Sequence, residues 1–175
     1  MKLEFKQSFR ILHTTPLETA QAYLRDPLAS LKGVSFMRDL KLEGSRLEEN
    51  RLEAPIVTAE LLVSVPLLGD LPIPFKSTLE PTAEGANLHP LELSGKTWAK
   101  VSGVGRALET ELLYDLHVEV FVELPGGEKW GGFAFSKMVD ATSKKALERV
   151  LKEFPRGVSS GLVHYSHSKS TVTLE

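Results

Sequence analysis

The 175-residue chain contains no cysteine. This absence excludes disulfide bonds, thiol nucleophiles, iron–sulfur clusters and cysteine-based zinc sites. An excess of one charge is also lacking, because 21 Lys and Arg residues face 23 Asp and Glu residues. Such a balance gives no basic surface for nucleic acid and no acidic tail, so we expect no nucleic-acid partner. No stretch approaches the ~18 apolar residues of a membrane span, so any membrane contact would be peripheral.

Asparagine and glutamine are scarce, with two of each, while charged residues make up 25% of the chain. Few thermolabile side chains together with many charges resemble the composition of thermophile proteins. The first residues alternate charged and apolar side chains and contain no apolar segment of signal-peptide length. We therefore expect a cytoplasmic protein, long enough to fold without a metal or a disulfide.

The hydrophobic periodicity changes in a clear order along the chain. Residues 3–12 alternate apolar and polar side chains, which predicts a half-buried strand. Thr15-Pro16-Leu17-Glu18 has the residues of a helix start with a capping box. Asp26-Pro27 ends this helix and begins a short second one that extends to Gly33.

The middle of the chain favours strands joined by short turns, which predicts an antiparallel meander. Residues 36–43 and 47–53 are expected to form a hairpin around Gly44-Ser45. The expected strands are 36–43, 47–53, 56–66, 73–80, 86–94, 97–108 and 111–124. Pro125-Gly126-Gly127 then ends the sheet.

A long amphipathic helix is predicted over residues 131–154, and such a helix must cover an apolar surface. Pro155 is expected to end it. Residues 156–175 are rich in Ser and Gly and then alternate weakly, so an added strand is one form that this tail could take. We expect a single domain over 1–155 and a tail over 156–175.

This order of elements resembles the START-like (SRPBCC) superfamily, whose fold is the helix grip. The local matches are Thr15-Pro16-Leu17-Glu18, Leu24-Arg25-Asp26-Pro27 and Leu31-Lys32-Gly33-Val34. Val63-Ser64-Val65-Pro66-Leu67-Leu68-Gly69 and the helix from Gly131 to Phe154 look like the carbon-monoxide-dehydrogenase G-like branch, or a separate bacterial family within the superfamily. The likeness covers residues 1–154.

The resemblance implies an α+β helix-grip fold, in which a curved antiparallel sheet surrounds a long C-terminal helix and two short helices follow the first strand. It also implies an apolar cavity between helix and sheet. Members of the superfamily bind lipids, sterols, quinones or polyketides, and some are cyclases, dehydratases or hydrolases. Because fold does not fix function, these activities are analogies.

The expected ligand site combines the apolar side of the long helix with the facing side of the sheet. Its residues are Phe135, Val139, Asp140, Thr142, Ser143, Ala146, Leu147, Val150, Val57, Leu61, Gly103, Val118 and Val120. Asp140 and Ser143, together with Ser136, would orient a ligand in an apolar pocket, or they lie at the edge of the helix face in water. Gly103 and Gly105 leave room under the helix, either for a ligand or for close packing.

Other polar groups are weaker candidates. Asp115, His117 and Glu119 share one strand face, but the opposite face is rich in Val and Leu, so these three are expected to face water. His164 and His167 lie outside any expected helix and lack further ligands, which does not suit a metal site. We therefore expect no catalytic motif, no metal and no cofactor.

The segment from Leu67 to Phe75 is expected to be an exposed apolar tip. Its apolar residues are Leu67, Leu68, Leu71, Ile73 and Phe75. A cluster of this kind gates a cavity, touches a membrane or joins a dimer, or it folds over the open end of the grip.

The function that the sequence favours is binding or carriage of a hydrophobic small molecule, such as a lipid or a quinone. One alternative is a cyclase or dehydratase that uses polar groups of the same cavity, with Asp140 as a base pointing inward. Another is a protein-interaction module without a cavity, in which the apolar loop and the tail contact a partner or a second copy in a homodimer.

Overall fold

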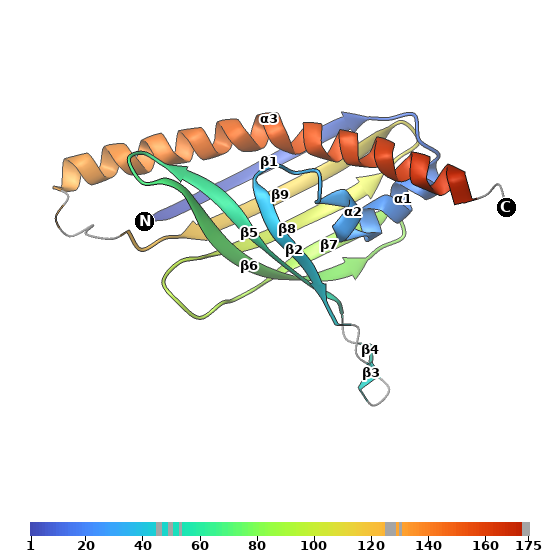
Figure 1. Ribbon diagram of the computed structural model, residues 1–175, viewed down its shortest axis with the longest axis horizontal. Coiled ribbons are helices and arrows are strands. Elements are labelled where there is room, and N and C mark those ends of the chain that lie inside the picture. The colour runs from blue at the N-terminus through green and yellow to red at the C-terminus, as the bar shows by residue number, and fades with distance from the viewer. Residues whose placement is uncertain (45–46, 49–50, 53, 125–128, 130, 173–175) are drawn as a thin grey trace.

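A long helix lies along one face of a curved sheet in the computed structural model (Figure 1), which describes residues 1–44, 47–48, 51–52, 54–124, 129 and 131–172. Within these residues, seven strands form the sheet in the order β1-β9-β8-β7-β6-β5-β2. The strands are β1 (Lys2–Leu12), β2 (Met37–Glu43), β5 (Ile56–Val65), β6 (Gly69–Pro81), β7 (Gly85–Leu91), β8 (Trp98–Ala107) and β9 (Glu111–Phe121). The helices are α1 (Leu17–Arg25), α2 (Pro27–Ser30) and α3 (Gly132–Val172).

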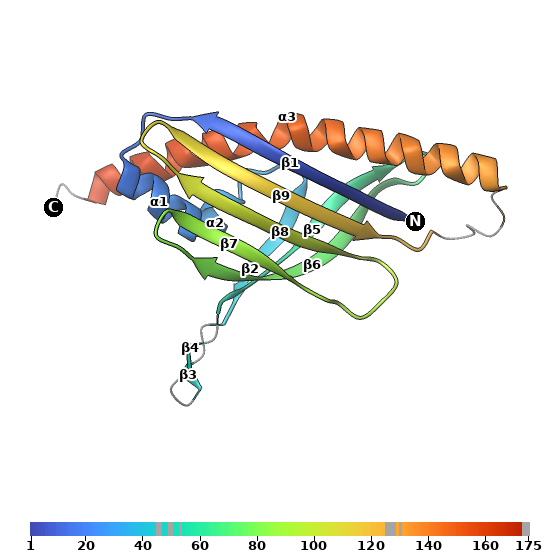
Figure 2. The same ribbon diagram turned by 180° about the vertical axis from the view of Figure 1, so that it is seen from behind.

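Neighbouring strands run antiparallel, apart from one parallel pair between Phe75 of β6 and Ala99 of β8. The expected helix-grip architecture is therefore confirmed. Figure 2 shows it from behind, with β1, β9, β8 and β7 in front of α3. No helix among the described residues is both long enough and apolar enough to cross a membrane.

The core lies between α3 and the concave side of the sheet. In β5, alternate residues from Val57 to Val65 are buried, as the period of two in the sequence predicted. From the helix side, the Phe154 ring packs 5.0 Å from the ring of Phe9 and 5.1 Å from that of Tyr114, measured between centroids. Burial of each such side chain contributes about 1.5–3 kcal/mol.

The Asp-Pro corner between α1 and α2 is confirmed. The Asp26 carboxylate accepts a hydrogen bond of 3.1 Å from the Ala29 amide and so caps α2, and Pro27 occupies its first turn. The capping box predicted at the start of α1 is wrong. Pro16 is the N-cap residue, and no side chain caps this end.

One predicted hairpin is also wrong. β2 pairs with β5, and β3 (Leu47–Glu48) pairs instead with β4 (Arg51–Leu52) in a separate small ribbon. Segment 47–53 is rich in charged residues and has no apolar face to bury, whereas β5 has one. Ser45 of the predicted turn, residue 53 and Pro125-Gly126-Gly127 lie outside the described residues.

The largest departure from prediction is the end of α3, which passes through Pro155 and continues to Val172. A proline inside a helix removes one hydrogen bond and costs ~3 kcal/mol. Packing offsets this cost, because Val158 and Leu162 are 0% and 1% exposed and the Tyr23 hydroxyl donates to the Val158 carbonyl over 2.8 Å. The strand suggested for the tail is therefore wrong over residues 156–172, while the domain boundary at 155 stays a prediction.

Candidate ligand pocket

An apolar pocket of about 80 Å³ lies between α3 and the sheet. Its walls come from both short helices, from α3 and from strands β1, β2 and β5 to β9. Part of the predicted site lines it: Leu61, Gly103, Val118, Val120, Ala146 and Val150. Their role in binding a ligand stays a prediction.

The remaining predicted residues do not line this pocket. Val57 and Thr142 are fully buried, and the Thr142 hydroxyl donates back to the Met138 carbonyl over 2.8 Å. Ser143 bonds in the same way to the carbonyl of Val139 over 2.9 Å. Phe135, Val139 and Leu147 are half-buried on α3 but are not part of the pocket lining.

Asp140 points away from the pocket and is exposed, so its predicted role as an inward base is wrong. It lies two positions from both Met138 and Thr142, which are buried. Two positions correspond to a rotation of about 200° around a helix, so Asp140 falls on the opposite side. Ser136, two positions before Met138, is exposed for the same reason.

Tyr114 is a pocket residue that was not among the predicted ones. It is 7% exposed, and its hydroxyl has no hydrogen-bond partner among the described residues. The ring lies over Gly105, its cross-strand partner, where a side chain would crowd it. Leu116 covers Gly103 in the same manner. Burial raises the pKa of Tyr114 well above its ordinary value, so the hydroxyl remains protonated and can donate a hydrogen bond.

The sequence did carry a signal for this tyrosine. The alternation of residues 111–124 places Tyr114 on the apolar side of its strand, and two glycines lie on the apolar side of the preceding strand. What the sequence could not supply was the register that sets Tyr114 opposite Gly105.

Polar side chains gather at one end of the pocket, where α3 passes the edge of β5. The last β2–β5 pair joins Met37 and Leu61, so beyond this point the edge of β5 faces the helix. There Arg149 donates to the Leu62 carbonyl over 3.4 Å. It also pairs with Asp70 of the β5–β6 hairpin, at 3.6 Å. Both views show this hairpin beside α3 (Figures 1 and 2).

Ser64 and Lys145 complete this polar end of the pocket. The Ser64 hydroxyl donates to the Asp70 carboxylate. This bond, together with the charges of Arg149 and Lys145, holds the pKa of Asp70 below its ordinary value. We call the group of Ser64, Lys145 and Arg149 the pocket mouth.

Glu153 lies one turn further along α3 and links the mouth to the connection between α2 and β2. Its carboxylate accepts hydrogen bonds from the Ser35 hydroxyl and from Nε of Arg149, the latter over 3.2 Å. The Ser35 bond, with a smaller contribution from Arg149, lowers the pKa of Glu153. Arg149 and Glu153 thereby tie α3 to the β5–β6 hairpin and to the connection between α2 and β2.

The exposed apolar tip is smaller than predicted. Leu67, with φ of +69°, is 93% exposed, and Leu68 is also exposed. Leu71 is half-buried, whereas Ile73 and Phe75 belong to the core, so their predicted exposure is wrong. β6 begins at Gly69, and its alternation turns these three side chains inward.

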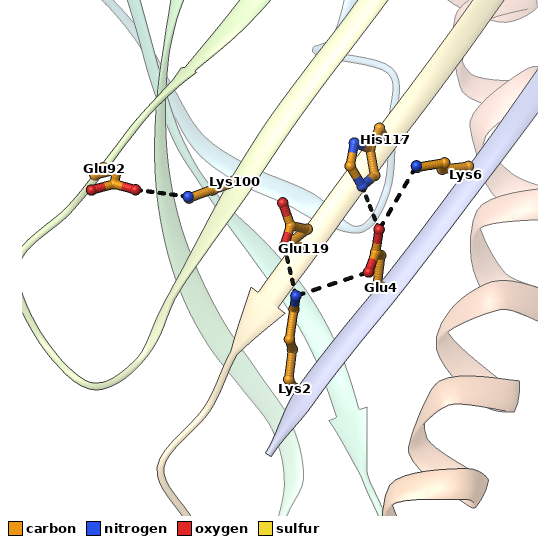
Figure 3. A network of polar contacts seen from close by, with 7 residues as sticks. All are labelled: Lys2, Glu4, Lys6, Glu92, Lys100, His117 and Glu119. Carbon is orange, nitrogen blue, oxygen red and sulfur yellow. Dashed lines mark hydrogen bonds and ion pairs between the residues drawn. The ribbon is translucent and has the colours of Figure 1, made fainter.

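Asp115, His117 and Glu119 lie on the outer face of the sheet, as expected. Asp115 accepts a 2.5 Å hydrogen bond from the Ser8 hydroxyl, and His117 lies 2.9 Å from Glu4. Glu119 pairs with Lys2 at 2.9 Å, and this contact lowers the pKa of Glu119 (Figure 3). Exposed pairs of this kind contribute little to stability.

A second hollow of about 440 Å³ lies on this outer face, across β1, β9, β8 and β7. Its lining mixes polar side chains, Asp115 and His117 among them, with apolar ones. His164 and His167 lie far along the chain, on α3, in a helix rather than outside one. Among the described residues, no three His, Asp or Glu side chains come together as a metal site.

A curved antiparallel sheet that grips a long C-terminal helix is the START-like helix-grip fold. The chain belongs to the family described as "Protein of unknown function (DUF3809)", which matches residues 8–152. No curated protein matches the chain. The resemblance to the carbon-monoxide-dehydrogenase G-like branch stays a prediction.

Solved structures of the same fold include biosynthetic enzymes. The Zhui aromatase/cyclase from Streptomyces sp. R1128 is 16% identical, with a TM-score of 0.52 over 97% of this chain and 96% of that one. TTHA0849 from Thermus thermophilus is 15% identical, with a TM-score of 0.52 over 89% and 96%. The di-domain ARO/CYC BexL from the BE-7585A biosynthetic pathway is 9% identical, with a TM-score of 0.54 over 92% and 50%.

The chain spans about half the length of the di-domain ARO/CYC proteins that it matches, at 53% and 50%. At these sequence identities the similarity is one of fold, and it does not transfer the enzymatic activity of these proteins to this chain.

Proposed function

We propose that the protein binds or carries a hydrophobic small molecule, such as a lipid or a quinone, in the pocket between α3 and the sheet. The observation that supports this most directly is the pocket wall, which is apolar except for Tyr114, Ser30 and the pocket mouth. Burial of a ligand against such a wall contributes about 25 cal/mol for each Å² of apolar area, before the cost of ordering the ligand is subtracted.

A cyclase-type enzyme is the second candidate, and Tyr114 is the observation in its favour. A protonated hydroxyl in an apolar wall could donate to a ligand carbonyl and polarise it. Acid–base chemistry also needs a base within reach of the substrate. Among the described residues, no carboxylate or histidine lines the pocket, so binding without chemistry is the better supported function.

The test uses the fluorescence of Nile red, a neutral apolar dye, together with native mass spectrometry of protein purified without detergent. Ala146 lines the pocket, and Ala146→Trp would fill it. Ala141 is exposed on the same helix, so Ala141→Trp is the matched control. We expect saturable binding of one dye per chain in the wild type and in the control, and at least ~10-fold weaker binding in Ala146→Trp.

A second filling variant, Ala86→Leu, acts from the opposite wall and covers the case in which Ala146→Trp does not fold. Circular dichroism verifies the fold of each variant before titration. Dye binding that both filling variants leave unchanged would overturn the proposal, because the dye would then bind elsewhere.

A further inference from the structure

The shape of the pocket limits what can enter it. Its volume is about 80 Å³, and part of it is open to solvent. Yet its lining extends from Leu24 of α1 and Pro27 of α2 to Ser64 near the end of β5. A small volume with walls so far apart describes a long and narrow space. A single flexible chain fits such a space more closely than a branched or two-chain molecule does.

The two ends of the pocket differ in polarity. Around Leu24, Ala86 and Phe154 the walls carry no charged side chain, and their polar groups are the hydroxyls of Ser30 and Tyr114. At the pocket mouth, the guanidinium of Arg149 and the ammonium of Lys145 lie one helical turn apart on α3. A molecule with an apolar chain and an anionic head is therefore expected to place its head at the mouth.

The charges at the mouth favour an anionic head. Arg149 is 24% exposed, and its contacts within the protein use Nε toward Glu153 and Nη1 toward Leu62 and Asp70. Its other terminal nitrogen, Nη2, and the exposed Lys145 are the donors that a ligand oxygen would meet. A partly buried guanidinium forms strong paired hydrogen bonds with a carboxylate.

Asp70 indicates what this mouth accommodates, since it places a carboxylate 3.6 Å from Arg149. At that distance the pair is an ion pair without a short hydrogen bond. Asp70 is about half exposed, and its carboxylate also accepts a hydrogen bond from Ser64. If the ion pair with Arg149 breaks, this carboxylate therefore still has water and Ser64 as partners. A ligand carboxylate arriving from inside the pocket would compete with Asp70 for the same cation.

We infer that the ligand is a single-chain carboxylate, such as a long-chain fatty acid, whose chain occupies the pocket and whose carboxylate binds Arg149 and Lys145 at the pocket mouth. This inference rests on the proposed function and specifies its ligand. Two-chain lipids are disfavoured by the small volume of the pocket, and neutral heads leave the two cations without a new partner.

The experiment measures displacement of Nile red by dodecanoate and by 1-dodecanol, which share a chain and differ in the head. We expect the wild type to bind dodecanoate about tenfold more tightly than the alcohol. Arg149→Gln should remove this preference by weakening the acid while leaving the alcohol within about twofold. Lys145→Gln, which breaks no hydrogen bond or short ion pair within the described part of the chain, should lower acid affinity by about threefold.

Asp70→Asn tests whether the Asp70 charge competes with the ligand carboxylate for Arg149, while the hydrogen bond to Ser64 is kept. Asparagine keeps an oxygen that can accept from Ser64, but it removes the negative charge that competes for Arg149. We expect this variant to bind dodecanoate more tightly than the wild type and the alcohol equally well. Lys144→Gln is the matched control, because Lys144 is an exposed neighbour outside the pocket lining.

The outcomes keep the two proposals apart. Equal affinity for acid and alcohol in the wild type, or weaker acid binding in Asp70→Asn, would overturn the inference while the proposed function stands. Failure of both compounds, and of the dye itself, to bind the wild type would overturn the proposed function as well.

Discussion

The backbone of Gly33, just after α2, lies directly against the backbone of Gly157 in α3. A Cβ atom on either glycine would overlap the carbonyl group of the other, closer than real Cβ atoms approach. One turn further along α3, Gly161 leaves the room that the Tyr23 hydroxyl occupies. These glycines let the second half of α3 touch the two short helices, although glycine is a poor helix former.

Gly157→Ala should therefore destabilise the protein. At an ordinary helix position the same change stabilises by about 0.5–1 kcal/mol. Here the added methyl group meets rigid backbone, so we expect the free energy of unfolding to fall by about 1–3 kcal/mol. Urea denaturation measures the change. Gly132→Ala is the control, because a Cβ there meets nothing within 4 Å, and equal effects at both sites would contradict the close contact.

The continuation of α3 past Pro155 makes a second prediction. Leu162 is 1% exposed and its neighbour Val163 is 50% exposed, as expected when one face of a helix is buried. Leu162→Ala should cost about 2–5 kcal/mol in the free energy of unfolding. Val163→Ala should cost less than about 1 kcal/mol. If thermal and urea unfolding show similar losses for the two variants, residues 156–172 do not pack as this helix does.

Acid should weaken the contact between α3 and the α2–β2 connection. The pKa of Glu153 is lowered in the folded protein, mainly by the Ser35 hydroxyl. A lowered pKa stabilises the fold above the unfolded value of about 4.3, and this contribution is lost as the pH falls through the folded value. Glu153→Gln should thus be less stable than the wild type at pH 7, with the difference shrinking below about pH 4.

Urea denaturation of Glu153→Gln between pH 7 and pH 3 checks this expectation. Glu148→Gln on the exposed side of α3 is the control. A stability difference between wild type and Glu153→Gln that stays constant over this range would show that the carboxylate charge contributes nothing.

The fold was predictable where a local pattern and the final packing agree. The alternation of β5 and the Asp26 corner are properties of a few neighbouring residues, and both were confirmed. Pro155 is the opposite case. Its local effect is to break a helix, but the contacts that outweigh it come from Gly33 and Tyr23, more than 120 residues earlier.

The pocket was predictable only in part for a similar reason. A helix wheel identifies the apolar face of α3, but the predicted face was too wide. It included Asp140, which is exposed to solvent. Arg149 had the sequence signature of the polar face. Its position at the pocket mouth depends on β2 ending its pairing with β5 at Leu61, which is a property of the sheet and not of the helix.

Tyr114→Phe tests whether the Tyr114 hydroxyl contributes to stability or to ligand binding. The buried hydroxyl has no partner among the described residues, and a polar group of this kind costs about 1–3 kcal/mol. Its removal should leave the ligand-free protein equally stable or more stable by about 1 kcal/mol, as measured by urea denaturation. Tyr114→Phe should also leave dodecanoate affinity unchanged, because the carboxylate is expected at the opposite end of the pocket.

Tyr23→Phe is the contrasting variant, because the Tyr23 hydroxyl donates a hydrogen bond to the Val158 carbonyl. This variant should lower the free energy of unfolding by about 0.5–1.5 kcal/mol. A loss of stability in Tyr114→Phe as large as that in Tyr23→Phe would mean that the Tyr114 hydroxyl is satisfied after all.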